Sequence, residues 1–211
     1  DHYLADHPFS PFEARVRACL AAVDEAAERT GRRALYVPNL SGTPDQVRRQ
    51  ADFAQAAGAG AVMVAPMLLG MPFFHELTHG RLDVPVLAHP SFGGVQRILP
   101  EAIFGKLFRL FGADAVIFAN YGGRFAYPPA VCRRLADALR RDWHGYAAAF
   151  PVPAGGMKVE RTDELVAFFG PDTVLLIGGS LLEAGDHLLD RTLAFTEAVK
   201  ESAKVEGRRS K

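Results

Sequence analysis

The chain has 211 residues, 49% of them hydrophobic, and its 24 basic and 24 acidic residues give a formal net charge of zero. This size suits one globular domain with a substantial core, and the charge balance gives no electrostatic case for binding nucleic acid or an anionic membrane. No apolar run approaches the ~18 residues of a membrane span, and no signal peptide is visible. We expect the two cysteines, Cys19 and Cys132, to be buried reduced thiols, which favours a cytoplasmic protein.

Helical and strand patterns alternate along the whole sequence. The predicted helices are about 12–30, 44–57, 70–79, 98–111, 128–141, 162–169 and 181–203. The predicted strands are 34–37, 61–65, 85–88, 115–119, 150–153 and 173–177. Successive strand ends lie 23 to 34 residues apart, which is typical of βα units in a parallel α/β fold.

Six such units fit the end of a TIM (β/α)8 barrel. A complete barrel takes about 250 residues, so we expect a fragment that covers roughly strands 3 to 8 and the helix after strand 2. A doubly wound sheet is the alternative, which would explain six strands without truncation but not a chain that begins within a unit. We expect residues 1–203 to form the barrel domain, truncated at its N-terminus, and residues 204–211 to be a disordered basic tail.

In a barrel all strands end on one catalytic face, so the residues that follow each strand would meet there. Strand 150–153 is followed by Gly155-Gly156, and strand 173–177 by Gly178-Gly179-Ser180. Glycine lets backbone N–H groups approach a phosphate closely, and a helix that follows presents its positive end. The same face would also collect Asp1, His2, Asn39, His89, Asn120 and Arg124. Together these residues predict an active site.

Several stretches carry a family likeness. Residues 1–17, 86–94, 104–124 and 153–180 most specifically resemble the C-terminal barrel domain of the RuBisCO large-chain superfamily, and the likeness covers essentially all of residues 1–200. The chain looks closest to the RuBisCO-like proteins, which share the fold but do not fix CO2.

The resemblance implies a Mg2+ site at the end of the second strand. Family members build this site from a carbamylated lysine, an Asp and a Glu. Asp1 matches the Asp, His2 stands where the Glu is expected, and the lysine would lie just upstream of Asp1, outside this chain. Because Mg2+ prefers hard oxygen ligands, His2 is a departure, and it is either a ligand or a neighbour of the metal.

The resemblance also assigns the remaining site residues. His89 matches a histidine that handles protons and substrate oxygens, although Pro90 replaces the arginine expected next. The sixth-strand histidine is missing before Asn120, and Arg124 stands near the mobile-loop lysine of true carboxylases. The backbone phosphate site of the family is matched by Gly155, Gly156, Gly178 and Gly179. These matches imply catalytic roles for His89, Asn120 and Arg124, a single phosphate pocket, a monophosphate substrate and no carboxylase activity.

Loop 120–125 and residues 104–114 most resemble members that decarboxylate 3-oxo-isoapionate 4-phosphate. We therefore expect a carboxy-lyase that forms a metal-stabilised enediolate from a 3-oxo sugar-acid monophosphate. The alternatives are an enolase or isomerase of a methylthio keto-pentose phosphate in methionine salvage, and an inactive truncated scaffold. The resemblance also implies a homodimer in which the N-terminal domain of the partner completes each active site.

A competing motif is His75-Glu76-Leu77-Thr78-His79, which matches the His-Glu-x-x-His helix of zinc metallopeptidases. Histidines at i and i+4 share a helix face, and the glutamate can act as a base. The third metzincin histidine is absent, however, because Leu82 occupies its position, and Gly80 ends the helix early. We expect a short helix with partly exposed histidines.

Overall fold

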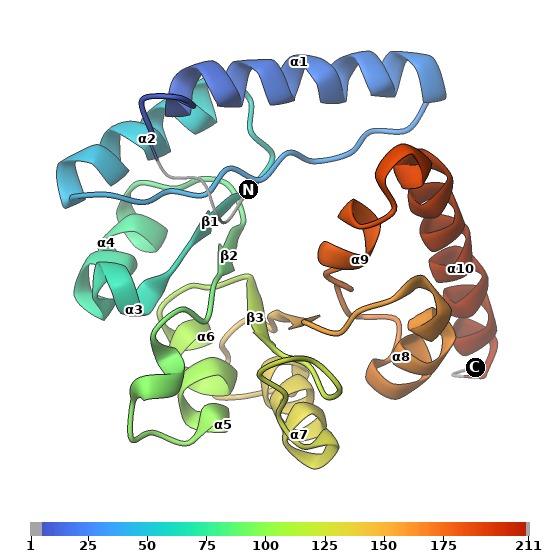
Figure 1. The fold of residues 1–211 in the computed structure, drawn as a ribbon. Coiled ribbons are helices and arrows are strands. Elements are labelled where there is room, and N and C mark those ends of the chain that lie inside the picture. The colour runs from blue at the N-terminus through green and yellow to red at the C-terminus, as the bar shows by residue number, and fades with distance from the viewer. Residues whose placement is uncertain (1–5, 210–211) are drawn as a thin grey trace. The chain divides into compact units, whose positions relative to one another are not determined.

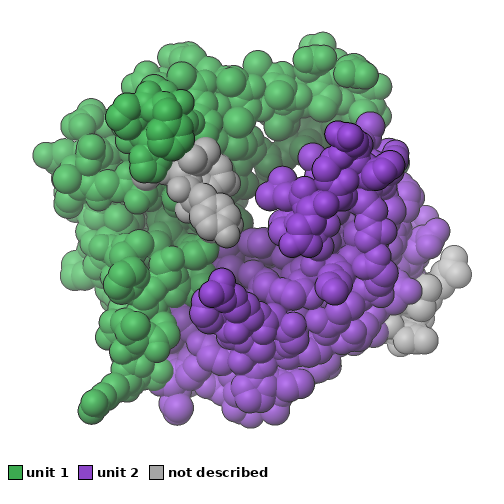
Figure 2. Space-filling view, in the orientation of Figure 1, with its two compact units in different colours: residues 1–98, 107–116 green, residues 99–106, 117–211 purple. Residues whose placement is uncertain are grey.

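The computed structural model describes residues 6–209, with residues 205–209 described by their backbone alone. The chain divides into two compact units (Figures 1 and 2). Unit 1 comprises residues 1–98 and 107–116, and unit 2 comprises residues 99–106 and 117–211. Within residues 6–209, none of the helices has the length and apolar content needed to cross a membrane.

Unit 1 begins with two helices that lie side by side, α1 (Phe12–Thr30) and α2 (Pro44–Ala56) (Figure 1). Gly31 ends α1 in the left-handed conformation, and Thr43 begins α2 in a capping box with Gln46. The unit continues with β1 (Val62–Val64), α3 (Pro66–Leu69), α4 (Met71–Gly80), β2 (Val86–Ala88), a 3-10 turn (Gly93–Val95) and α6 (Phe108–Leu110). Phe74 and Phe108 meet edge to face in its core.

Unit 2 packs a mixture of short and long helices around the last strands. Its elements are α5 (Pro100–Ala102), α7 (Pro129–Arg140), β4 (Phe150–Ala154), a 3-10 turn (Val159–Arg161), α8 (Thr162–Phe169), α9 (Gly179–Leu182), a second 3-10 turn (Gly185–His187) and α10 (Leu188–Arg209). The described part of α10 lies against α8 (Figure 1). Buried Phe118 and Phe169 meet edge to face in the core of this unit.

Among the described residues, four strands form one sheet in the order β1-β2-β3-β4, where β3 is Ala115–Ala119. Strand β1 pairs with β2 in parallel from Val62↔Val86 to Val64↔Ala88, and β2 pairs with β3 in parallel. A doubly wound sheet reverses its strand order at a switch point, whereas a barrel keeps neighbours consecutive. The consecutive order therefore favours the barrel over its alternative.

The two outer predicted strands are not regular strands. Residues 34–37 form no regular strand and are followed by an isolated parallel bridge, Asn39↔Met63, whereas 173–177 contain only the isolated bridge Ala154↔Leu176. The second bridge is weak because Pro151 and Pro153 of β4 accept hydrogen bonds from Val174 and Leu176 but have no N–H to donate in return. The prediction of six regular strands was wrong at these two positions.

Two predicted helices are interrupted. The helix expected at 98–111 consists of α5, a π-helical turn (Ile103–Leu107) and α6. At Gly105 an added Cβ would lie 2.9 Å from the Cβ of Ala138, so α7 passes very close to this turn. The helix expected at 181–203 is divided at Gly185, whose φ is 53°. Helix α10 then continues to Arg209 and includes residues 204–209, which we expected in the tail.

Candidate functional site

Unit 2 joins three segments that carry predicted site residues. These segments are loop 120–125 after β3, loop 155–157 after β4, and residues 178–180 at the start of α9. The backbone N–H of Asn120 donates to the carbonyl oxygen of Ala154 at 2.8 Å, and the hydroxyl of Ser180 donates to the carbonyl oxygen of Met157 at 2.9 Å. Asn120 and both predicted glycine pairs therefore belong to one connected region.

The glycine pair at 155–156 packs directly on the backbone of loop 120–125. Gly156 has a φ of 65°, and a Cβ there would lie 2.5 Å from the carbonyl oxygen of Gly122. A Cβ on Gly123 would lie 2.8 Å from the carbonyl carbon of Gly155. Only glycine allows this close approach, so the two loops fix each other's backbone.

The second glycine pair has a different environment. A Cβ on Gly178 or Gly179 would have no neighbour within 4 Å, so the backbone is open on that side. We expected a long helix after this pair, but α9 spans only Gly179–Leu182. Individual N–H groups, and not the dipole of a long helix, are therefore what this segment offers to an anion.

Asn120 is fully buried and has one polar atom without a partner. Its Nδ2 donates to the Sδ of Met157 at 3.3 Å, whereas its Oδ1 has no hydrogen-bond partner in the described part of the chain. An unpaired buried acceptor costs about 1–3 kcal/mol. The Oδ1 of Asn120 is therefore an acceptor that the described part of the chain does not itself satisfy.

Sequence reasoning missed a charged cluster that lies beside these loops, formed by Tyr121, Arg161 and Glu164. Arg161 donates to the carboxylate of Glu164 at 2.7 and 2.9 Å, and the hydroxyl of Tyr121 donates to the same carboxylate at 2.8 Å. The bonds from Arg161 and Tyr121 hold the pKa of Glu164 down at about 2, while burial and the bond to Glu164 raise the pKa of Tyr121 to about 12. From sequence alone, Arg161 and Glu164 look like an ordinary surface pair at i and i+3.

Arg124 lies on the exposed part of loop 120–125. Its guanidinium is 5.3 Å from the ring centre of Phe125, which is itself 78% exposed. The predicted catalytic arginine thus occupies a different environment from buried Asn120 on the same loop.

His89 follows β2 in unit 1. Its backbone N–H donates to the carbonyl oxygen of Val64 at 2.7 Å, which ties it to the end of β1. Asn39 forms a bridge with Met63, the residue before Val64 in β1. His89 and Asn39 therefore both contact β1 in unit 1. The N–H of Ser91 donates to Nδ1 of His89 at 3.3 Å, which favours the tautomer with its proton on Nε2.

The predicted metal ligands Asp1 and His2 lie outside the described residues. Within residues 6–209, no group of three or more His, Cys, Asp or Glu side chains is placed to hold a metal ion. This part of the chain therefore does not form the predicted Mg2+ site by itself, and the ion remains a prediction.

The zinc-peptidase motif lies on α4 in an unsuitable arrangement. Both carboxylate oxygens of Glu76 accept from Arg48, at 2.8 and 3.1 Å, and this bonding holds the pKa of Glu76 below its usual range. The rings of His75 and His79 are stacked, with centroids 4.0 Å apart. The glutamate is thus engaged in an ion pair, and the helix is as short as expected.

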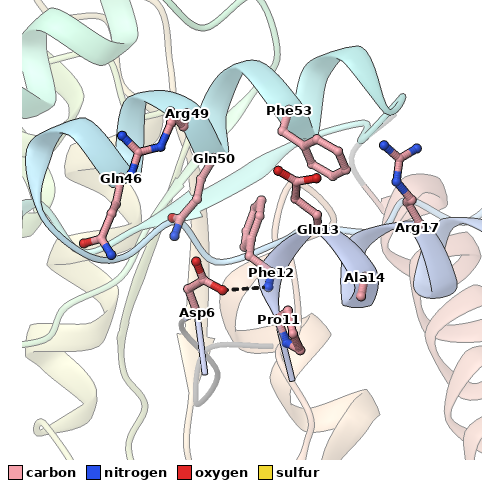
Figure 3. A pocket seen from close by; sticks show the side chains of 10 residues that line it. All are labelled: Asp6, Pro11, Phe12, Glu13, Ala14, Arg17, Gln46, Arg49, Gln50 and Phe53. Atoms are coloured by element: carbon pink, nitrogen blue, oxygen red, sulfur yellow. Dashed lines mark hydrogen bonds between the residues drawn. The ribbon is translucent and has the colours of Figure 1, made fainter. Parts of the chain in front are cut away.

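A cavity with a volume of about 580 Å3 lies in unit 1. Figure 3 shows that its lining side chains come from the segment before α1, from the start of α1 and from α2. It is lined by Asp6, Pro11, Phe12, Glu13, Ala14, Arg17, Gln46, Arg49, Gln50 and Phe53. None of the predicted site residues is among them, so this cavity is not the predicted active site.

Consecutive strands in one sheet, with parallel pairing from β1 through β3 and helices between the strands, are the arrangement of part of a (β/α)8 barrel. Residues 1–187 match the family described as "Ribulose bisphosphate carboxylase large chain, catalytic domain". The chain therefore belongs to this family.

Two relatives and one solved structure make the likeness more specific. The chain is 52% identical over 199 residues to ribulose bisphosphate carboxylase-like protein 1 of Rhodopseudomonas palustris, covering 94% of this chain and 54% of the relative. It is 46% identical over 203 residues to 5-methylthioribulose-1-phosphate isomerase of Rhodospirillum rubrum, covering 96% and 54%. A crystal structure of a Rubisco-like protein from Rhodopseudomonas palustris matches with a TM-score of 0.88 and 44% identity, covering 95% and 55%.

These comparisons confirm the predicted RuBisCO-like membership and the barrel fold. The chain spans about half the length of the curated relatives it matches.

Proposed function

We propose that the chain is the barrel part of a RuBisCO-like enzyme that isomerises a methylthio keto-pentose phosphate. The observation that carries this proposal is the 46% identity to 5-methylthioribulose-1-phosphate isomerase over 96% of the chain. The comparisons thus favour the alternative, a methionine-salvage reaction, over decarboxylation of a 3-oxo sugar-acid monophosphate. The carboxy-lyase is kept as a competing outcome of the assay below.

The reaction needs a proton-handling group and a phosphate anchor. Isomerisation of a keto sugar phosphate proceeds when a base removes the proton beside the carbonyl and a proton returns to the neighbouring carbon of the enediolate. We assign the proton transfer to His89, because imidazole exchanges protons near neutral pH and Ser91 orients its ring. Asn120 and Arg124 are assigned to the substrate oxygens.

The phosphate is assigned to the backbone N–H groups of Gly155, Gly156, Gly178 and Gly179. Support comes from the contact of Gly156 with Gly122 and from the bond between Ser180 and Met157, which join the two segments. Preorganised N–H groups bind an anion without the cost of ordering a flexible loop.

Mg2+ is proposed to bind through Asp1, with His2 as a second candidate and a carbamylated lysine upstream of Asp1. Bound there, the ion would polarise the substrate carbonyl. A cytoplasmic homodimer whose partner subunit completes the site also belongs to this proposal.

The test uses the full-length protein with Mg2+ and 5-methylthioribulose 1-phosphate, followed by phosphorus and carbon NMR in deuterated water. We expect a new phosphate ester that carries solvent deuterium, with no release of CO2. Parallel reactions contain a 2,3-diketo-5-methylthiopentyl phosphate, 3-oxo-isoapionate 4-phosphate, or ribulose bisphosphate with CO2. Turnover of the diketo phosphate alone would identify an enolase, CO2 release would identify a decarboxylase, and no turnover of any substrate would identify an inactive scaffold.

A matched pair of variants tests the assignment of His89. His89→Asn should abolish turnover, whereas His144→Asn should leave it unchanged. His144 is a suitable control because it is exposed and has a φ of 51°, which asparagine adopts readily. Full turnover by His89→Asn would remove the histidine from the mechanism.

A further inference from the structure

We propose that Arg161 is a positioning residue for phosphate binding, because it fixes the backbone of loop 155–157 against loop 120–125. The inference rests on the proposed phosphate site and adds a residue that touches neither the substrate nor the reacting atoms. It concerns contacts within unit 2 alone.

Arg161 connects the two loops directly. Its Nη1 donates to the carbonyl oxygen of Gly156 at 3.3 Å and to that of Tyr121 at 3.5 Å. These carbonyls lie on either side of the place where Gly156 packs on Gly122. The guanidinium group of Arg161 therefore binds both loops at the point where they contact each other.

The direction of the Gly156 carbonyl matters for anion binding. In a trans peptide the C=O and the following N–H point in opposite directions. Holding the Gly156 oxygen toward Arg161 thus fixes the orientation of the 156–157 peptide, which directly follows the Gly155 and Gly156 N–H groups assigned to the phosphate. Gly155 and Gly156 have φ values of 90° and 65°, and glycine has wide conformational freedom, so this peptide needs an external restraint.

The Arg161 side chain is itself fixed by its neighbours. Its Nε and Nη2 donate to both carboxylate oxygens of Glu164, and its guanidinium lies 5.0 Å from the centre of the Tyr121 ring. Tyr121 donates to the same carboxylate and packs on Phe168, whose ring centre is 4.7 Å away. The charged carboxylate and the protonated phenol persist across neutral pH, as the low pKa of Glu164 and the high pKa of Tyr121 indicate.

A stability role alone does not account for this arrangement. The side chains of Arg161 and Glu164 are 23% and 51% exposed, and ion pairs this close to solvent contribute little to folding. The contacts of Arg161 with two loop carbonyls instead restrict loop geometry, which would be expressed in ligand affinity.

The experiment compares the full-length wild-type protein with Arg161→Met, Arg161→Lys and a control, Arg133→Met. Arg133 lies in the same unit and stacks on Phe168 at 4.2 Å, and within residues 6–209 its side chain forms no hydrogen bond to loop 120–125 or loop 155–157. Binding of inorganic phosphate is measured by titration calorimetry, KM and kcat with 5-methylthioribulose 1-phosphate, and Tm by calorimetry.

We expect Arg161→Met to weaken phosphate binding and raise KM by about tenfold, with a smaller change in kcat and little change in Tm. Arg161→Lys should restore only part of the affinity, because lysine cannot bind the carboxylate and the carbonyls together. The control should match the wild type.

Wild-type phosphate affinity in Arg161→Met would overturn the inference. Failure of the wild type to bind inorganic phosphate would also overturn it. The same holds if Arg133→Met loses as much affinity as Arg161→Met, or if the loss in Arg161→Met comes with a large fall in Tm. A wild type that binds phosphate without turning over the sugar phosphate would refute the proposed reaction alone, and the phosphate titrations would still decide the role of Arg161.

Discussion

Gly156→Ala is the sharpest test of how the predicted phosphate loop is built. Gly156 combines a left-handed backbone, with a φ of 65°, and a Cβ position only 2.5 Å from the carbonyl oxygen of Gly122. That oxygen belongs to the backbone of loop 120–125 and cannot rotate away as a side chain would. Alanine must therefore either distort the loop or separate it from its neighbour.

The magnitude follows from two contributions. A residue with a Cβ pays about 1–2 kcal/mol for the left-handed conformation, and forcing an extra carbon against fixed atoms adds about 1–3 kcal/mol. The free energy of unfolding should fall by about 2–5 kcal/mol. For a chain of this size each kcal/mol lowers Tm by about 2–4 °C, so we expect a decrease of roughly 4–20 °C.

Two matched variants separate the contributions in thermal denaturation followed by calorimetry. Gly155 has a φ of 90°, and a Cβ added there would lie 4.0 Å from its nearest neighbour, the Cα of Gly123. Gly155→Ala should therefore show only the backbone contribution. Gly179→Ala should leave Tm nearly unchanged, since Gly179 begins the helical residues of α9, its φ is not positive, and a Cβ there has no neighbour within 4 Å. Equal Tm values for Gly156→Ala and Gly179→Ala would refute the close packing of the two loops.

Three further experiments test other features of the structure. Asn120→Leu removes the unpaired buried oxygen, so Tm should stay constant or rise while turnover falls; a lower Tm with full turnover would contradict the assignment. Burial raises the pKa of the Cys132 thiol, whereas Cys19 is less buried. A thiol-reactive dye should therefore modify Cys19 in the folded protein and Cys132 only after unfolding. Equal rates of modification of the two cysteines would contradict this prediction. The pKa of Glu164 is lowered from 4.5 to about 2 in the folded protein. The Tm difference between wild type and Glu164→Gln should therefore be constant above about pH 4.5 and shrink toward pH 2. A Tm difference that grows on acidification would contradict the lowered pKa.

Much of the fold could be predicted because it depends on local patterns. The apolar runs near residues 62, 86, 115 and 150 are strands within a few residues of their predicted bounds. The outer strands could not be placed in the same way, because strand pairing depends on the neighbour. At 173–177 that neighbour is β4, whose two prolines remove donors from the ladder.

The interrupted helices show a second limit of sequence patterns. Residues 98–111 are rich in apolar side chains, and periodicity alone predicts a continuous helix. The π-helical turn occurs where Gly105 passes close to Ala138, a residue 33 positions away in sequence. Such a contact leaves no periodic trace, so only a structure can reveal it.

In the candidate site, too, local sequence features were predictable and contacts between distant residues were not. Glycine pairs after strands were visible in the sequence, and so was the histidine after β2. The packing of Gly156 on Gly122 and the bond from Arg161 to Tyr121 join residues 34 and 40 positions apart, and no motif marks them. What the sequence identified were the groups that could bind a phosphate, whereas the structure supplied what holds them in place.

The assigned roles lie on different compact units, which has a consequence for mutagenesis. The glycine loops, Asn120 and Arg161 belong to unit 2, whereas His89 belongs to unit 1. If phosphate binding depends on the backbone of unit 2, then His89→Asn should stop turnover without changing the affinity for inorganic phosphate. Arg161→Met should do the reverse, weakening the anchor while leaving the proton-transfer group intact. Opposite effects of these two variants on affinity and on kcat would support separate roles, and parallel losses would argue that the loops and the histidine act as one structural element.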